Sequence, residues 1–306
     1  MRKALVLAAL AACLALPAAG QQDFSKVEIK ADKLADGLWM LTGAGGNIAV
    51  SAGPDGVFLV DDQYAPLTDK IKAAVKALSD KPIRFVLNTH WHGDHTGGNE
   101  NLGKDGAVIV AHENVRKRMS VDQFNRFFNR TTPASPAAAL PLVTFAESVS
   151  FHVNGEDVDA VHVAPAHTDG DVVVFFRKAN VIHGGDTLFN GIYPFIDLSS
   201  GGSMDGMIAA ADRILAAADA STKIIPGHGP LATKADVKAY RDMLAASRDA
   251  ILPLVKAGKT LEEVKAAKPT AALDGKWGNA FVKPDLWDTV VYLSYGGKEP
   301  PPAPAK

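Results

Sequence analysis

The segment THWHGDHTGGN, residues 89–99, places three histidines and an aspartate within six consecutive positions. The whole chain of 306 residues contains only nine histidines, so a third of them gather here. A nearly all-apolar run, IRFVLNT at 83–89, leads into the cluster and has the composition of a strand buried on both faces. We therefore predict that the cluster lies on the loop that leaves a buried strand.

The residue types in this cluster are typical metal ligands. His90 and His92 can converge on one ion, while Asp94 and His95 can turn toward a second ion beside it. Imidazole and carboxylate suit zinc, and catalytic zinc sites keep one position open for water. Two zinc ions roughly 3.5–4 Å apart can share a hydroxide that acts as nucleophile near neutral pH. Asp94 is then the candidate catalytic acid-base, because it can orient that hydroxide and relay its proton.

The first twenty residues have the pattern of a secretory signal peptide. Arg2 and Lys3 precede an unbroken apolar run at 4–16, and small residues follow at 18–20. The apolar run is too short to span a bilayer as a permanent helix. We therefore expect residues 1–20 to be removed and the protein to be periplasmic or secreted.

Cys13, within this segment, is the only cysteine of the chain. The sequence LAAC at 10–13 resembles a bacterial lipobox, so a lipid anchor at Cys13 is the alternative to cleavage after Gly20; stable membrane insertion is not expected. The mature chain has no thiolate, so any metal must be held by imidazole and carboxylate. Loss of two positive charges changes the formal net charge from −2 to −4, and no basic run indicates nucleic acid. A small molecule is the expected partner.

Strand and helix patterns alternate in two similar halves. In the first half we predict strands at 37–43, 46–53, 56–62, 83–89 and 107–111, and a helix at 68–81. In the second we predict strands at 147–153, 157–163, 171–178 and 181–186, then helices at 203–219, 232–257, 260–268 and 285–294. The Pro- and Ala-rich segment 129–142 is expected to be a long surface loop, able to act as a lid. Two β blocks, each followed by helices, favour two packed sheets with helices outside.

The sequence HWHGDH at 90–95 resembles the signature of the metallo-β-lactamase superfamily. That family has further ligands in a fixed order, and the chain offers a candidate for each. HVAPAHTDGDVVVF contains His167, VIHGGDTLF contains Asp186, and IIPGHGP contains His228. The resemblance covers roughly residues 35–235.

This resemblance implies a fold and a ligand set. The fold is α/β (α+β), a four-layer αββα sandwich of two mixed sheets flanked by helices, with the ligands on loops at one edge. We expect one domain over 21–297, with a helical extension at about 232–297 and a proline-rich tail at 298–306. Two Zn²⁺ ions per chain are implied: one held by His90, His92 and His167, one by Asp94, His95 and His228, and both bridged by Asp186.

The substrate is less constrained by the sequence. The leading hypothesis is an exported dinuclear zinc hydrolase whose metal-bridging hydroxide opens a cyclic amide or ester. The sequence favours β-lactam and lactone substrates almost equally. Export matches the superfamily's β-lactamases, whereas aspartate at 186 is typical of its lactonases and thioesterases.

Two alternative activities remain open. One is a thioesterase similar to glyoxalase II, which GDTLF at 185–189 resembles, although the run that follows in that enzyme is replaced here by NGIY at 190–193. The other is a mononuclear iron dioxygenase acting on persulfides, which would need fewer ligands.

Several residues near the ligands are weaker candidates. Trp91 can shape the pocket floor or pack beneath the loop, and Asn190 and Tyr193 can donate hydrogen bonds to a substrate oxygen. His183, three residues before Asp186, can support the site.

Overall fold

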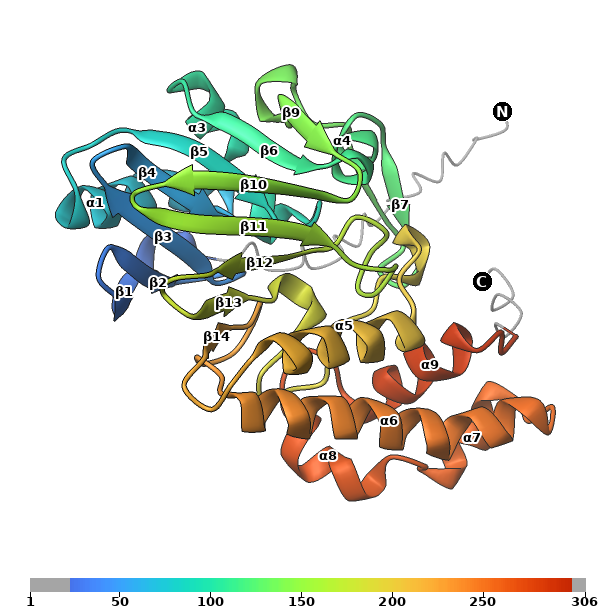
Figure 1. Ribbon diagram of the computed structural model, residues 1–306. Coiled ribbons are helices and arrows are strands. Elements are labelled where there is room, and N and C mark those ends of the chain that lie inside the picture. The colour runs from blue at the N-terminus through green and yellow to red at the C-terminus, as the bar shows by residue number, and fades with distance from the viewer. Residues whose placement is uncertain (1–22, 299–306) are drawn as a thin grey trace, which may run out of the picture.

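The computed structural model describes residues 23–298, and within that range the strands form two mixed sheets and a separate hairpin (Figure 1). The expected signal segment 1–20, with Cys13, lies outside the described residues, as does the tail from residue 299 onward. In spatial order, the first sheet contains β1 (Lys30–Ala35), β2 (Leu38–Thr42), β3 (Ile48–Gly53), β4 (Gly56–Val60), β5 (Ile83–Asn88), β6 (Val108–His112) and β9 (Val143–Phe145). The second contains β10 (Ser148–Val153), β11 (Glu156–His162), β12 (Val172–Phe176), β13 (Val181–His183) and β14 (Lys223–Ile225).

Both sheets combine antiparallel and parallel neighbours. β1 to β4 form an antiparallel meander, and β5, β6 and β9 then continue the sheet in parallel. β10 to β13 are antiparallel, and β14 joins β13 in parallel. A parallel pair needs a crossover connection. Helix α1 (Thr68–Leu78) lies in the connection from β4 to β5, and α5 (Met204–Ala217) lies in the one from β13 to β14.

The remaining elements are short helices and one hairpin in the first half, and helices of varied length in the second. The first half contains η1 (Phe24–Lys26), η2 (Ala65–Leu67), α2 (Gly93–Thr96), α3 (Asn99–Lys104), α4 (Glu113–Met119), the hairpin β7 (Gln123–Asn125) and β8 (Arg130–Thr132), and η3 (Ala137–Ala139). The second half contains η4 (Gly185–Thr187), η5 (Leu198–Ser200), α6 (Lys234–Lys256), α7 (Leu261–Ala267), α8 (Ala271–Trp277) and α9 (Pro284–Ser294).

Three hydrophobic clusters separate four layers. Between α1 and the first sheet, Ile71 and Val75 pack with Leu59 and its neighbours. Between the sheets, Phe58 and Leu87 pack with residues of β12. Outside the second sheet, other β12 residues pack against α5 and α6, which Figure 1 shows on that side. The expected αββα sandwich is thus confirmed.

Strand β12 shows how the sequence pattern produces two buried faces. Val172, Val174 and Phe176 belong to the cluster between the sheets, whereas Val173 and Phe175 belong to the cluster under α5. Successive side chains of a strand point to opposite faces, so an unbroken apolar run can fill two cores.

The C-terminal helices extend the outer cluster of the second sheet. Helix α6 begins with a capping box formed by Thr233 and Asp236, and α7 begins with one formed by Thr260 and Glu263. Trp287 of α9 is fully buried, and its indole N–H donates to the Ser247 hydroxyl at 2.9 Å. Helices α6 to α9, which lie in the stretch expected to be the helical extension, therefore pack with α5 in one layer on the second sheet.

Segment 129–142 differs from the expected irregular loop. It begins within the β7–β8 hairpin and contains η3, and Asn125 pairs with Arg130 across the hairpin. The turn includes Asn129 at φ 46°, a left-handed conformation that asparagine tolerates. The proline-rich composition hid this short hairpin because its strands are only three residues long.

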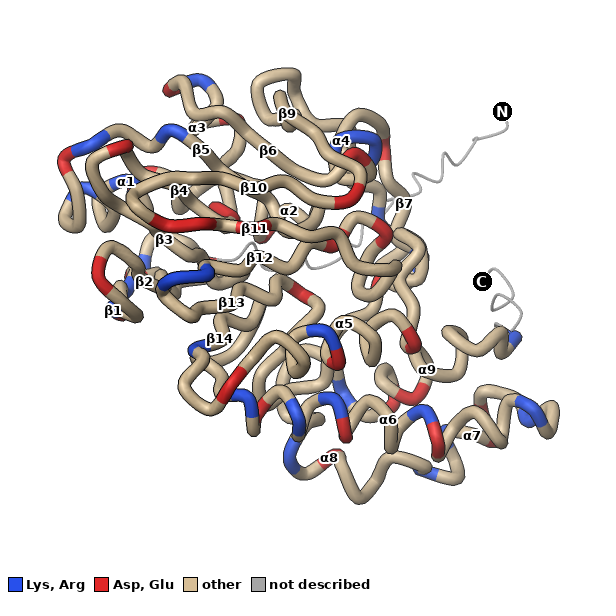
Figure 2. The backbone as a smooth tube through the Cα atoms, in the orientation of Figure 1, with Lys and Arg blue, Asp and Glu red and all other residues tan. Residues whose placement is uncertain are grey.

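The described helices include none that is both long and apolar enough to cross a membrane. Figure 2 shows Lys and Arg alternating with Asp and Glu along the C-terminal helices, in keeping with the near-neutral formal net charge of −2.

We predict that Phe58→Ala lowers the free energy of unfolding by about 3–5 kcal/mol, because it leaves a cavity between the sheets. Phe58 is fully buried, and its ring contacts those of Phe85 and Phe151. Phe124, which is 54% exposed, provides a matched control: Phe124→Ala should change stability by less than about 0.5 kcal/mol. Urea denaturation measures both, and equal losses in the two variants would contradict the layer assignment.

Candidate metal centre

The predicted ligands come from both sheets and meet at one edge of the sandwich. His90 follows β5, and the next three ligands of the motif lie at or in α2. His167 lies between β11 and β12, Asp186 lies in η4 after β13, and His228 follows β14. Their ligand atoms form two groups, each within 4.8 Å: His90, His92, His167 and Asp186 in one, and Asp94, His95 and His228 in the other.

The carboxylate of Asp186 lies between the two groups. Its Oδ2 is 3.7 Å from His90 Nε2 and 3.4 Å from His167 Nε2. Its Oδ1 is 3.1 Å from His95 Nε2 and 3.5 Å from His228 Nε2. Each oxygen therefore faces one group, which is the arrangement a bridging ligand needs.

Within each group, the ligand atoms also lie close to one another. His92 Nδ1 lies 2.8 Å from His167 Nε2 in the first group. In the second, Asp94 Oδ2 lies 3.3 Å from His228 Nε2 and 3.7 Å from His95 Nε2. The structure thus brings together all seven residues that we predicted from the sequence as metal ligands.

Two buried atoms at the centre have no hydrogen-bond partner among the described residues: His90 Nε2 and Asp186 Oδ1. Buried polar atoms are nearly always paired, and an unpaired one destabilises the fold. Glycines give the ligands room, since a Cβ on Gly46 would lie 2.0 Å from the His95 ring, and one on Gly227 would lie 2.0 Å from Asp186 Oδ1. The donor set and the unpaired atoms fit divalent metal ions.

The ligand imidazoles are oriented by acceptors on their far side. His92 Nε2 donates to Asp197 Oδ2 at 3.0 Å, and His95 Nδ1 donates to Asp61 Oδ2 at 2.8 Å. His167 Nδ1 donates to the Phe195 carbonyl at 2.6 Å. Such partners select the tautomer that turns the other nitrogen toward the metal.

Asp61 is held in a strained conformation. Its φ is 64°, in the left-handed region that few residues other than glycine adopt. The carboxylate accepts hydrogen bonds from Thr89 N and Thr89 Oγ1, both at 2.7 Å, besides the one from His95. These three buried hydrogen bonds offset the strain of the Asp61 backbone. They also join Thr89, the residue before His90, to His95 of the second group.

Asn47 and His183 fix the turns that carry the last two ligands. The Asn47 amide donates to the carbonyls of Pro226 at 2.8 Å and Gly229 at 2.9 Å, on either side of His228. His183 donates from Nε2 to the Asn47 carbonyl at 3.0 Å and accepts from Gly185 N at 3.1 Å. His183 thus supports the turn that contains Asp186.

Sequence inspection did not single out Asp61, Asp197 or Asn47. Asp61 lies at the end of the predicted strand GVFLVDD, residues 56–62. An acidic residue directly after an apolar run is a pattern that could have identified it as a candidate for the site. Asp197 and Asn47 stand in no comparable pattern, because only the folded chain brings them to their partners.

Burial and mutual charge divide the histidines into two kinds. Burial lowers the pKa of His90 well below its usual value and that of His167 to about 4, so both are neutral and ready to bind a cation. Burial alone would also lower the pKa of His95 and His228. The Asp186 and neighbouring carboxylates outweigh it, and they raise the pKa of His228 to about 9. Conversely, these cationic imidazoles keep the pKa of Asp186 well below its usual value despite burial.

A cavity of about 780 Å³ opens onto the two groups. Trp91 lines it but is largely buried, and its indole N–H donates to the Ser200 hydroxyl at 3.1 Å. Tyr193 also borders it, with its hydroxyl directed to Asp274 at 2.9 Å. The Asn190 amide donates instead to the Pro230 carbonyl at 3.0 Å. The donors of Trp91, Tyr193 and Asn190 are thus all occupied, and a substrate-binding role for these three residues stays a prediction.

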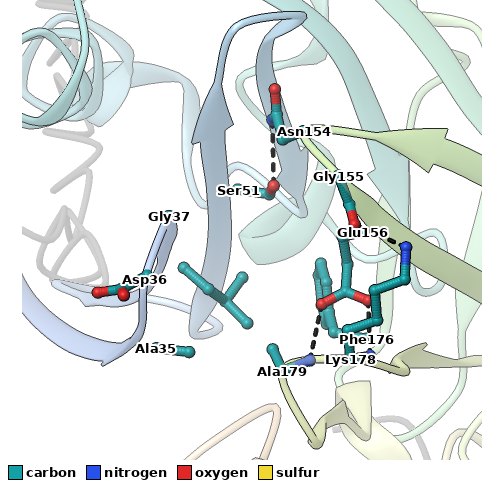
Figure 3. A pocket seen from close by; sticks show the side chains of 11 residues that line it. Ala35, Asp36, Gly37, Ser51, Asn154, Gly155, Glu156, Phe176, Lys178 and Ala179 are labelled. Atoms are coloured by element: carbon teal, nitrogen blue, oxygen red, sulfur yellow. Dashed lines mark hydrogen bonds between the residues drawn. The ribbon is translucent and has the colours of Figure 1, made fainter.

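A smaller cavity of about 290 Å³ lies elsewhere and includes none of the seven ligands (Figure 3). Its carboxylate, Glu156, accepts hydrogen bonds from the backbone N–H groups of Lys178 at 2.7 Å and Ala179 at 2.8 Å. Asn154 donates to the Ser51 hydroxyl at 3.1 Å. These groups fasten turns together, and none of them belongs to the two ligand groups.

The family model of the metallo-beta-lactamase superfamily matches residues 41–231, a span that includes both ligand groups. The chain belongs to the metallo-β-lactamase superfamily. The resemblance noted in the sequence is thereby confirmed, over well more than half of the chain.

Individual relatives are distant. A hydroxyacylglutathione hydrolase of Pelagibacter ubique is 28% identical over 123 residues, covering 39% of this chain and 43% of that protein. A metallo-beta-lactamase type 2 of Bacteroides fragilis is 21% identical over 185 residues, covering 57% and 68%. The chain spans about half the length of the curated relatives it matches first. A solved metallo-beta-lactamase from Pontibacter korlensis shares the fold with a TM-score of 0.59 and 19% identity, covering 71% of this chain and 99% of that one.

We predict that Asp61→Asn weakens zinc binding by about 10- to 100-fold, because the amide keeps only one of the two acceptor oxygens. Its NH2 group must then face either the Thr89 backbone N–H or the His95 N–H, which the carboxylate accepts at the same time. Competition with a chromogenic chelator measures the affinity. Asp80→Asn, on an exposed turn, is the matched control and should leave it unchanged. Unaltered zinc affinity in the Asp61 variant would show that this carboxylate does not orient its ligand.

Proposed function

We propose that the protein is a dinuclear zinc hydrolase that opens a cyclic amide or ester, either a β-lactam or a lactone. One observation carries the proposal: the Asp186 carboxylate presents one oxygen to each of two ligand groups. A site for a single ion would need only one of these groups. The mononuclear iron dioxygenase is therefore the weaker alternative.

The residues divide the work between binding and proton handling. His90, His92 and His167 would hold one ion, Asp94, His95 and His228 would hold the other, and Asp186 would bridge them. Two zinc ions held there would lower the pKa of a bound water and so supply hydroxide near neutral pH.

Asp94 is placed to handle the proton of the reaction. It borders the cavity on the side of the second group. Burial alone would raise its pKa, but the charge of His95 and the hydrogen bond from His228 outweigh burial and lower the pKa to about 2. An ionised carboxylate can orient the attacking hydroxide, accept its proton and deliver it to the leaving group.

The comparisons support two substrate classes. Similarity to the β-lactamases of Bacteroides fragilis and Pontibacter korlensis favours a cyclic amide. The higher identity to hydroxyacylglutathione hydrolase favours a thioesterase as a second candidate. We also propose export to the periplasm or beyond, on the sequence of residues 1–20 alone.

Metal analysis and a substrate panel test the proposed reaction. We expect two zinc ions per chain, and chelator-sensitive turnover of nitrocefin or an acyl-homoserine lactone that exceeds turnover of a glutathione thioester. Faster hydrolysis of the thioester would favour the second candidate. One iron per chain with oxygen consumption would overturn the hydrolase proposal.

We predict that Asp94→Ala lowers kcat by at least about 100-fold while the free energy of unfolding stays close to that of the wild type. Asp32→Ala, on exposed β1, is the control for loss of a carboxylate. Zinc content, measured in the same samples, separates loss of the second ion from loss of proton handling. Full activity in the Asp94 variant would remove this residue from the mechanism.

A further inference from the structure

Two arginines line the cavity at the metal centre, and they differ in whether a carboxylate is paired with the guanidinium. Arg118 is occupied: its Nε and Nη2 each lie 2.7 Å from the Asp169 carboxylate, and its Nη1 donates to Gln123 at 3.1 Å. Arg130, at the start of β8, makes no ion pair or side-chain hydrogen bond with any residue between 23 and 298. Among the described residues, Arg130 is thus the cavity's cation that is free to bind a ligand.

The hairpin that carries Arg130 is tied to the metal centre. Asp197, which accepts from the ligand His92, also accepts from Asn125 Nδ2 at 3.3 Å. Asn125 is the cross-strand partner of Arg130. A second bond, from Arg126 N to Ser199 Oγ at 3.3 Å, fastens the turn to the same segment. The position of Arg130 is therefore set relative to His92 and does not depend on a free loop.

The same cavity is lined by an aromatic wall of Phe128, Phe195 and Phe281, in which Phe195 is buried and the other two rings are exposed. Phe128 comes from the hairpin, and its ring centroid lies 5.8 Å from that of Phe281 and 5.2 Å from that of Phe195. Phe128 is 45% exposed and Phe281 is 66% exposed. Large apolar side chains left open at the mouth of a polar centre indicate that a ligand's apolar group covers them.

We propose that Arg130 and the aromatic wall form the recognition subsite for a substrate that carries both a carboxylate and an apolar group. The inference rests on the proposed hydrolase function and deepens it. A guanidinium binds carboxylate in a bidentate manner, whereas the wall accepts an aryl or alkyl substituent. Of the two cyclic substrates, a β-lactam with its ring carboxylate meets both requirements, and an uncharged acyl-homoserine lactone meets only the second.

The charge of Arg130 reaches a side chain of the cavity lining that also feels the centre. Tyr64 is a neutral phenol, because burial and the charges of Asp94 and Asp186 raise its pKa to about 12, while the charge of Arg130 acts in the opposite direction. Arg130 therefore lies close enough to this lining for its charge to act there, as an anchor for a substrate carboxylate requires.

A matched pair of substrates tests the subsite. With benzylpenicillin, Arg130→Gln should raise KM about 3- to 10-fold with a smaller change in kcat, and with the methyl ester of benzylpenicillin KM should change by less than about 2-fold. Arg130→Lys, which keeps the charge, should recover part of the loss. Lys117→Gln removes an equal charge from α4 outside the cavity lining and is the control. Equal KM shifts for acid and ester would overturn the assignment of Arg130.

Phe281→Ala tests the wall separately. It should raise KM for benzylpenicillin and its methyl ester alike, since the apolar contact does not depend on charge. No change for either substrate would remove the wall from the subsite.

Equilibrium binding separates failure of the subsite from failure of the proposed reaction. Calorimetry compares 4-phenylbutanoate with 4-phenylbutanamide on the zinc-loaded wild type and Arg130→Gln, so any carboxylate contact with the metal is common to both proteins. We expect the acid to bind about 3- to 10-fold more weakly to the variant and the amide to bind equally. If no substrate is hydrolysed but this difference persists, the hydrolase proposal fails and the subsite stands. If β-lactams are hydrolysed and the difference is absent, the subsite fails and the hydrolase proposal stands.

Discussion

The Asp186 carboxylate, with one oxygen toward each ligand group, is the contact on which the rest of the centre depends. It can occupy that position only because η4 follows β13 in the second sheet while the motif from His90 to His95 follows β5 in the first. The packed core between the sheets fixes the separation of these two strand ends, since a close-packed interior resists displacement. A change in sheet packing would therefore reach the metal centre directly.

The ligands are held by a surrounding set of acceptors. Asp61, Asp197 and the Phe195 carbonyl each fix one imidazole from behind. Asp61 does so from a left-handed backbone conformation, so local strain is retained where it positions a functional group. Asn47 joins the first sheet to the turn of His228, and through His183 to the turn of Asp186. Stability and function are coupled here, because the same buried hydrogen bonds serve both.

The cavity above the centre combines two kinds of recognition within one short hairpin. Arg130 contributes an unpaired charge and Phe128 an exposed ring, while Asn125 ties both to Asp197 behind a metal ligand. In a superfamily whose fold supports many reactions, such rim residues decide the substrate more than the layers do. The distant relatives, which are named for different activities, are consistent with that division.

The layered fold and the ligand candidates could be predicted from the amino-acid sequence alone. Apolar runs such as β12 and the periodic helix α1 have local signatures, and the HWHGDH cluster is too dense in one residue type to be an ordinary loop. The division of the Asp186 oxygens between the two groups becomes visible only in the folded chain, as does the support of the ligands by Asp61, Asp197 and Asn47. The same is true of the hairpin at the cavity, within which segment 129–142 begins. These features depend on contacts between residues up to 182 positions apart, such as Asn47 with Gly229. Local periodicity carries no information about such contacts, because they form only when both sheets have packed.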